Sequence, residues 1–128
     1  MNEYSVITKT RRRKLCMAAS DPEKPLAVIT HVAFGNGGIN ESGEPLVPLE
    51  TQTKLNSELA RYEVESVTYP DETTARYAVT IPQNELVGRE INEAALVDSD
   101  GDVVAIKNMY TKKKDEDVSF TFEFDDNF

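Results

Sequence analysis

Runs of apolar residues separated by polar turns predict a protein built mainly from β-hairpins. The region 91–109 contains two apolar runs around Asp100-Gly101, a dipeptide typical of the type I′ turn of a two-residue hairpin. A turn centred there places Val97 opposite Val104. Both faces of the predicted hairpin are largely apolar, so we expect it near the middle of a sheet that is covered on both sides.

A second hairpin is predicted from residues 62–69 and 74–81, which flank a polar turn at residues 70–73. Pairing Tyr69 with Thr74 gathers nearly all the apolar side chains of both strands on one face. The opposite face then carries charged and hydroxyl side chains, as expected for a face exposed to solvent.

Two further strands follow from the same reasoning. Residues 26–34 form a continuous apolar run that predicts a buried strand, and residues 118–124 alternate strictly between polar and apolar side chains, as in a half-buried strand. Residues 39–48 and 82–90 contain Gly and Pro and are predicted to be connections on the surface.

Helices are predicted in two places. Residues 6–19 have a strand-like start followed by a helix that Thr8 or Thr10 caps, and the proline after Asp21 ends it. Residues 49–60 predict a short second helix with two leucines on one face. The expected fold class is therefore α+β, mainly an antiparallel sheet built from hairpins, with an N-terminal helix and a second short helix, in one domain spanning residues 1–128.

Composition and charge exclude several classes of partner. The chain has 128 residues, 39% of them hydrophobic, and a net charge of −9, so nucleic acid and anionic membranes should repel it. Basic runs at 11–14 and 112–114 are read either as a nucleic-acid contact or as a solvated helix face and a solvated loop. The second reading is favoured because no aromatic residues interleave with them.

No apolar run reaches membrane-spanning length, and the start of the chain lacks the features of a signal peptide. With Cys16 as the only cysteine no internal disulfide forms, which fits a reducing cytoplasm.

The glycine-rich segment Gly35-Asn36-Gly37-Gly38 lacks the Gly-Lys-Ser/Thr ending of a phosphate-binding loop. We therefore interpret its glycines as allowing a tight or left-handed backbone path.

The three aspartates at positions 98, 100 and 102 suggest a calcium site, but the sequence around them does not match an EF-hand loop. Position six of such a loop is glycine and position twelve is glutamate, whereas this chain has Val103 and Met109 there. We expect a polar turn without a metal. His31 is the only histidine and is interpreted as a strand residue on a half-exposed face, and no nucleophile motif accompanies it. No catalytic residue, cofactor or enzyme activity is predicted.

Taken in order, several segments resemble the N-terminal domain of phage tail-collar fibre proteins. The resemblance covers roughly residues 5 to 125. The residues that carry it are Ile7, Thr8, Lys14, Leu15, Ala18 and Ala19; Ile29, Thr30, Ala33, Gly35, Gly37 and Gly38; Thr53, Leu55, Glu58 and Arg61; and Glu93, Leu96, Asp98, Gly101, Ala105 and Asn108.

The resemblance implies a structural role in the virion tail: attachment of a tail fibre to the baseplate of a contractile-tail phage, a prophage or a related phage-tail-like particle. It implies a baseplate protein or a distal fibre protein as partner, a homotrimer in the assembled particle, and synthesis in the bacterial host cytoplasm. The family domain precedes a long fibre and this sequence ends at Phe128. We therefore expect the distal fibre either on a separate protein or on a part of the chain beyond this sequence.

We expect partner contacts at the loops of residues 35–48 and at one sheet edge, where free backbone groups can pair with another chain. The residues named for this role are Gly35, Asn36, Gly37 and Gly38, together with Arg11, Arg12, Arg13 and Lys14 if the partner surface is acidic. Asp100 and Gly101 are expected to have a structural role in the turn.

An unrelated, non-viral binding module for carbohydrate or protein on a similar sheet is the competing interpretation. For a glycan binder, exposed aromatic side chains in a groove would be expected, and Tyr69 and Tyr110 are the candidates.

Overall fold

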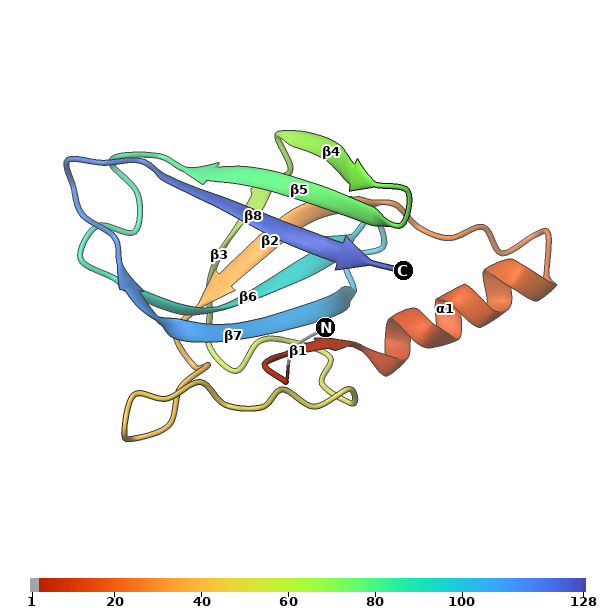
Figure 1. Ribbon diagram of the computed structural model, residues 1–128, viewed down its shortest axis with the longest axis horizontal. Coiled ribbons are helices and arrows are strands. Elements are labelled where there is room, and N and C mark those ends of the chain that lie inside the picture. Colours follow the sequence, from red (N-terminus) through yellow and green to blue (C-terminus); the bar gives the residue numbers. More distant parts are fainter. Residues whose placement is uncertain (1–2) are drawn as a thin grey trace.

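The computed structural model describes residues 3–128, which contain one helix and eight strands in two antiparallel sheets (Figure 1). The predicted α+β, mainly β fold class is confirmed, with one helix in place of two. The five-stranded sheet has the order β1-β7-β6-β2-β3 and the three-stranded sheet the order β4-β5-β8. The elements are α1 (Lys9–Ser20), β1 (Ser5–Ile7), β2 (Ile29–Gly35), β3 (Glu58–Glu63), β4 (Ser66–Asp71), β5 (Thr74–Ile81), β6 (Glu90–Asp98), β7 (Val103–Lys113) and β8 (Phe120–Asn127).

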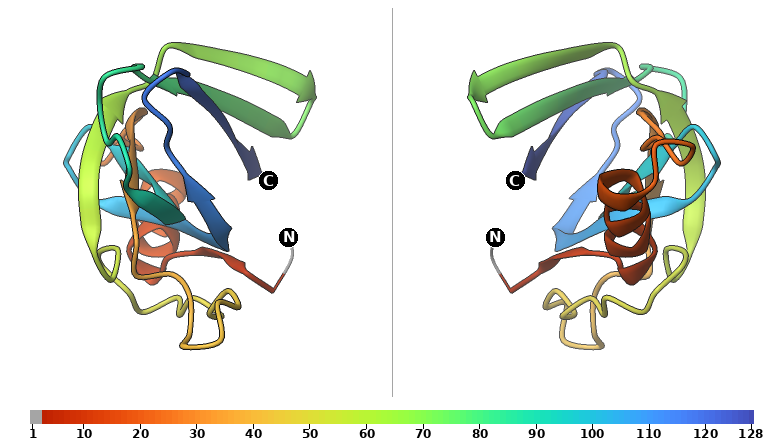
Figure 2. Two further views of the ribbon diagram at one scale, coloured as in Figure 1. Left: turned by 90° about the vertical axis from the view of Figure 1, so that its left-hand side faces the viewer. Right: turned by 90° about the vertical axis from the view of Figure 1, so that its right-hand side faces the viewer.

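The two sheets face each other around one main core, and α1 lies at one end of the molecule (Figures 1 and 2). Aromatic rings link the sheets, since Phe34 of β2 makes an edge-to-face contact with Phe122 of β8 at 5.3 Å between centroids. A smaller apolar cluster covers the opposite face of the five-stranded sheet, where Leu55 packs with Ala33 and Ile106. No helix among residues 3–128 has the length and apolar character needed to cross a membrane.

The central hairpin predicted from residues 91–109 is confirmed as β6 and β7. Strand β6 is the middle strand of its sheet and is buried on both faces from Ile91 to Asp98. The predicted type I′ turn is wrong: four residues, 99–102, separate β6 from β7, and Val97 pairs with Val103. Only Gly101 of this loop has a positive φ, +85°. The amides of Asp100 and Asp102 both donate to the Asp98 carboxylate, which stabilises the wider turn.

The second predicted hairpin is only partly correct, because its first strand divides between the two sheets. Residues 58–63 pair with β2, whereas residues 66–71 pair with β5. The register also differs by one residue from the prediction, since Val67 lies opposite Tyr77. Pro70 has no N–H to donate, and the ladder is interrupted between Thr68 and Asp71.

The predicted second helix at residues 49–60 is wrong. One turn forms, in which the Gln52 side chain accepts from the Leu49 amide, and the chain then enters β3. A helix needs the amides of Asn56 and Ser57 for its own hydrogen bonds, but both donate to the buried carboxylate of Glu93. This tertiary interaction outweighs a weak local helix preference.

The N-terminal helix is confirmed, and Thr8 is its N-cap. The Thr8 hydroxyl accepts from the Arg11 amide at 3.3 Å and donates to the Val103 carbonyl at 3.0 Å. A single buried side chain therefore caps α1 and fixes it to β7. Cys16 lies on the exposed side of this helix.

The alternating C-terminal segment forms β8, which runs to Asn127. Phe122 and Phe124 point into the core, and Asp126 continues the buried alternation with a carboxylate. The polar end of the chain is therefore part of the sheet.

Candidate docking surfaces

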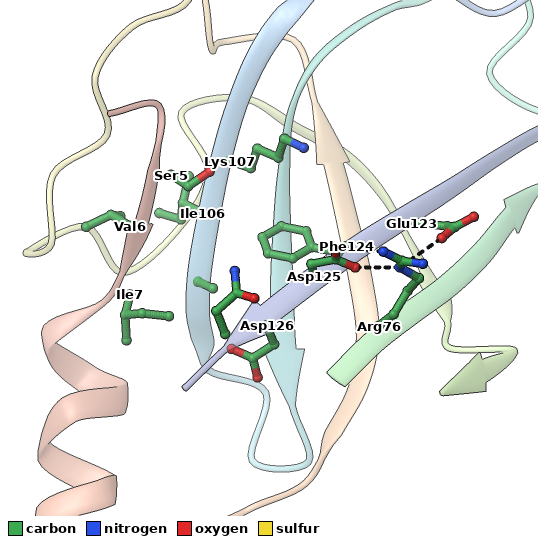
Figure 3. Close-up of a pocket in the computed structure, with 12 residues that line it drawn as sticks. Ser5, Val6, Ile7, Arg76, Ile106, Lys107, Glu123, Phe124, Asp125 and Asp126 are labelled. Carbon is green, nitrogen blue, oxygen red and sulfur yellow. Dashed lines mark hydrogen bonds and ion pairs between the residues drawn. The ribbon is translucent and has the colours of Figure 1, made fainter. Parts of the chain in front are cut away.

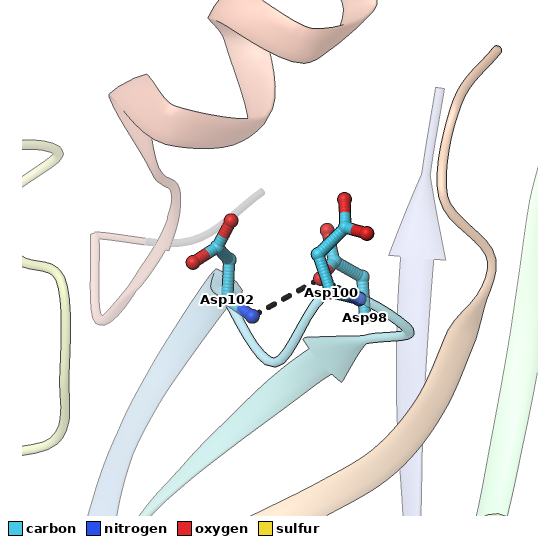
Figure 4. A group of neighbouring side chains, drawn as sticks. All are labelled: Asp98, Asp100 and Asp102. Atoms are coloured by element: carbon cyan, nitrogen blue, oxygen red, sulfur yellow. Dashed lines mark hydrogen bonds between the residues drawn. The ribbon is translucent and has the colours of Figure 1, made fainter.

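The three aspartates of the central turn lie close together at the tip of the β6–β7 hairpin (Figure 4). All three form ion pairs with one lysine from α1. The Lys14 ammonium lies 2.7 Å from Asp98, 3.0 Å from Asp100 and 2.7 Å from Asp102. Burial opposes the charged form, but hydrogen bonds to Asp102, Asp98 and Asp100 together raise the pKa of Lys14 above its ordinary value. The cation among these carboxylates is thus a side chain of the protein itself, and the cluster joins α1 to the tip of the hairpin.

The rest of the basic run is also largely engaged within the molecule. Arg11 is buried and pairs with Asp126, and Arg12 pairs with Glu50 at 3.0 Å. Arg13 is exposed and makes no ion pair within residues 3–128. Of the four residues predicted to meet an acidic partner, Arg13 therefore offers the freest charge.

The glycine segment packs against the buried Glu93, which is not among the predicted site residues. Oxygens of the fully buried Glu93 carboxylate accept from the amides of Gly37 at 2.9 Å, Asn56 at 2.9 Å and Ser57 at 2.8 Å. A Cβ on Gly35 would lie 2.4 Å from this carboxylate. The predicted tight path is confirmed, and the left-handed alternative is wrong because Gly35, Gly37 and Gly38 lack a positive φ.

Two asparagines position the loop that follows. The Asn92 side chain accepts from the amide of Gly38 at 2.7 Å, and the Asn108 side chain donates to the carbonyl of Leu46 at 2.9 Å. Leu46 and its neighbour Val47 are exposed. The segment of residues 35–48 therefore presents apolar side chains and the exposed Asn36 from a backbone fixed to the sheet.

A cavity of about 300 Å³ opens between β1 and β8 (Figure 3). We call it the β1–β8 groove. In it, the Arg76 guanidinium bridges Asp125 at 2.8 Å and Glu123 at 3.1 Å. The hydrogen bond from Arg76 lowers the pKa of Asp125 below its ordinary value. The lining residues are Ser5, Val6, Ile7, Arg76, Ala105, Ile106, Lys107, Glu123, Phe124, Asp125, Asp126 and Asn127.

An apolar patch lies beside the end of β8. Val28, Val67, Tyr69 and Phe128 are all exposed, and they line one shallow pocket of about 340 Å³. Exposed apolar side chains that gather in this way are typical of a contact surface. Tyr110 is exposed too, but it lies on β7, in the other sheet, so it does not share this pocket.

The sequence contained partial signals for the residues that our prediction missed. Glu93 is a charged residue inside an apolar run, and its presence in a strand predicted to be covered on both faces already required a buried partner. Asp126 follows the alternation of Phe122 and Phe124 by two more positions. Their partners come from segments far away in the chain, and no local pattern identifies them.

The free strand edges, the groove and the apolar patch on a rigid β core are typical of a domain that binds other polypeptides through its surface. A family model described as phage tail-collar fibre protein, N-terminal, matches residues 1–121. The chain therefore belongs to the phage tail-collar fibre protein family, as the resemblance predicted.

Membership of this structural family implies a component of the phage tail, located in the virion tail. No curated protein and no solved structure matches the chain.

Proposed function

We propose that this chain attaches a tail fibre to the baseplate of a contractile-tail phage or of a related phage-tail-like particle. The observation that carries the proposal is the family match over residues 1–121, nearly the whole chain. Such attachment needs a rigid domain with docking surfaces and does not require an active site.

The segment of residues 35–48 supports this role as one docking surface. Its backbone is fixed by Glu93, Asn92 and Asn108, so the backbone that carries the exposed Leu46 and Val47 loses little conformational freedom when a partner covers it. A preorganised loop of this kind suits a stable protein–protein interface in an assembled particle.

The assembled state in this proposal is a homotrimer whose partner is a baseplate protein, a distal fibre protein or both. Arg13 is the residue of the basic run with a free charge for an acidic partner. Its contribution should fall as salt rises, because exposed charges are screened over about 10 Å at 0.1 M salt.

The test uses tail particles assembled in a host from which the gene for this chain has been deleted. Purified chain is mixed with these fibre-less particles, and the bound fraction is measured after sedimentation. We expect saturable binding with a dissociation constant below roughly 10 µM, and competition by unlabelled chain. Absence of binding by the folded chain would contradict the proposal and favour a binding module unrelated to attachment.

A further inference from the structure

One wall of the β1–β8 groove is a strand edge with free backbone groups. The Phe128 amide donates to the Thr73 carbonyl at 2.8 Å, and this fixes the alternation along β8. The even-numbered residues of β8 therefore direct their N–H and C=O groups to β5, and the odd-numbered residues direct theirs away from it. Within residues 3–128 these outward groups have no backbone partner, and they belong to Thr121, Glu123, Asp125 and Asn127.

The opposite wall is a second free edge, provided by β1. The Thr8 amide donates to the Val104 carbonyl at 3.0 Å, so Thr8 faces β7. By the same alternation, Ser5 and Ile7 direct their backbone groups away from β7. Both residues line the groove, and Figure 2 shows that β1 and the end of β8 lie on the same side of the molecule.

A buried acceptor without a donor lies in the same place. Arg11 donates to Oδ1 of Asp126, but Oδ2 of this carboxylate is buried and has no hydrogen-bond partner within residues 3–128. Asp126 is one of the residues that line the groove (Figure 3). Leaving a buried acceptor unpaired is unfavourable. Because Arg11 already neutralises the charge, a neutral N–H or O–H suits this position.

The geometry points to an extended polypeptide segment as the occupant. Repeated outward N–H and C=O groups on a strand edge pair with the main chain of another strand, whereas a small molecule meets few of them. We infer that the β1–β8 groove binds an extended segment of the baseplate-side partner, which adds to β8 as an extra strand and donates a hydrogen bond to Asp126. This inference rests on the proposed function and adds to it the surface used and the conformation of the partner.

The other free edges of the chain make a second copy a poor source of this strand. In β4 the ladder is interrupted after Thr68, and Pro70 has no N–H to donate. In β3 the outer edge is short and carries Glu58, Arg61 and Glu63, and such charges protect edges from pairing. The segment therefore comes from a different polypeptide.

The test compares variants for binding to the fibre-less particles described above. Asp125→Pro removes an N–H that points into the groove and leaves the backbone hydrogen bonds between β8 and β5 in place, while it also removes the ion pair of Asp125 with Arg76. Ser5→Trp fills the groove from the opposite wall. Glu63→Pro is the matched control on the far edge of β3, since the Val64 amide donates to the Thr30 carbonyl and Glu63 therefore faces outward. Melting curves identify any variant that is unfolded.

We expect Asp125→Pro and Ser5→Trp each to weaken binding by about tenfold or more, and Glu63→Pro to bind like the parent chain. Hydrogen exchange should also slow at the amides of residues 121, 123, 125 and 127 when the chain is bound to particles. If all three variants bind like the parent chain and exchange at these amides is unchanged, the groove is not the binding surface, although the attachment role itself would still hold. Self-association of the free chain that Asp125→Pro abolishes would overturn the choice of occupant. Failure of the parent chain to bind would contradict the proposed function itself.

Discussion

The Arg11 guanidinium and the Asp126 carboxylate form a buried ion pair at 2.7 Å that joins α1 to the last strand of the chain. Their side chains are 5% and 0% exposed. The same guanidinium lies 5.1 Å from the centre of the Phe128 ring, so it also supports the end of β8. One arginine of a run that resembles a solvated helix face thus positions a wall of the groove.

Removing one partner of this pair should be costly. We expect Arg11→Met to lower the free energy of unfolding by about 3–5 kcal/mol, because it leaves Asp126 as a buried charge without compensation. Urea denaturation measures the change. Arg13→Met is the matched control in the same helix and should change stability by less than about 0.5 kcal/mol. Equal effects of the two substitutions would mean that the Arg11 pair is exposed in solution.

Replacing Glu93 with glutamine should destabilise the fold although the two side chains have nearly the same shape. The carboxylate accepts hydrogen bonds from three backbone N–H groups through its two oxygens. The glutamine amide has only one oxygen, so its NH₂ group would face at least one of these N–H donors. We expect a loss of about 2–3 kcal/mol in urea denaturation. Glu90→Gln, at the exposed start of the same strand, is the control and should be neutral. A stable Glu93→Gln variant would show that the segment of residues 35–48 is held by other contacts.

The Lys14 cluster predicts a dependence of stability on alkaline pH. Because the pKa of Lys14 is raised in the fold, its stabilisation is complete below the unfolded pKa of about 10.4 and is lost as pH rises through the higher folded pKa. We expect Lys14→Met to lower stability by about 1–2 kcal/mol at pH 7. The difference between parent and variant should shrink above about pH 11. A difference that stays constant up to the pH at which the parent unfolds would argue against charge as its origin.

Gly101 is the residue of the central turn that most needs to be glycine. Its φ of +85° is strained for any β-branched residue. We expect Gly101→Val to cost more than about 1 kcal/mol and to lower the melting temperature, whereas Ser99→Ala in the same loop should have little effect. An unchanged melting temperature for Gly101→Val would mean that the loop adopts another conformation at no cost.

Local sequence patterns predicted correctly those elements that have a clear turn signal or a regular apolar pattern of their own. The apolar runs around Gly101 predicted the central hairpin, and the alternation through Phe122 predicted β8. The pattern around Leu55 failed because Glu93, distant in sequence, binds amides that a helix would need. The prediction of one continuous strand over residues 62–69 was wrong because periodicity does not show where a chain leaves one sheet for another.

The candidate docking surfaces were predictable to a similar degree. The glycines of residues 35–48 and the place of this segment in the chain predict a loop that contacts a partner. The groove depends on the spatial proximity of β1 and β8, which come from the two ends of the sequence. The basic run does not reveal that Arg11 and Lys14 pair within the molecule, because their partners are about a hundred residues away along the chain.

Electron cryo-microscopy of the assembled particle tests the attachment role most directly. The eight-stranded fold of this chain should be found in three copies where the fibre meets the baseplate, with extended density of the baseplate-side protein between β1 and β8. Finding the fold at the distal tip of the fibre, or finding no copy of it in complete particles, would contradict the account.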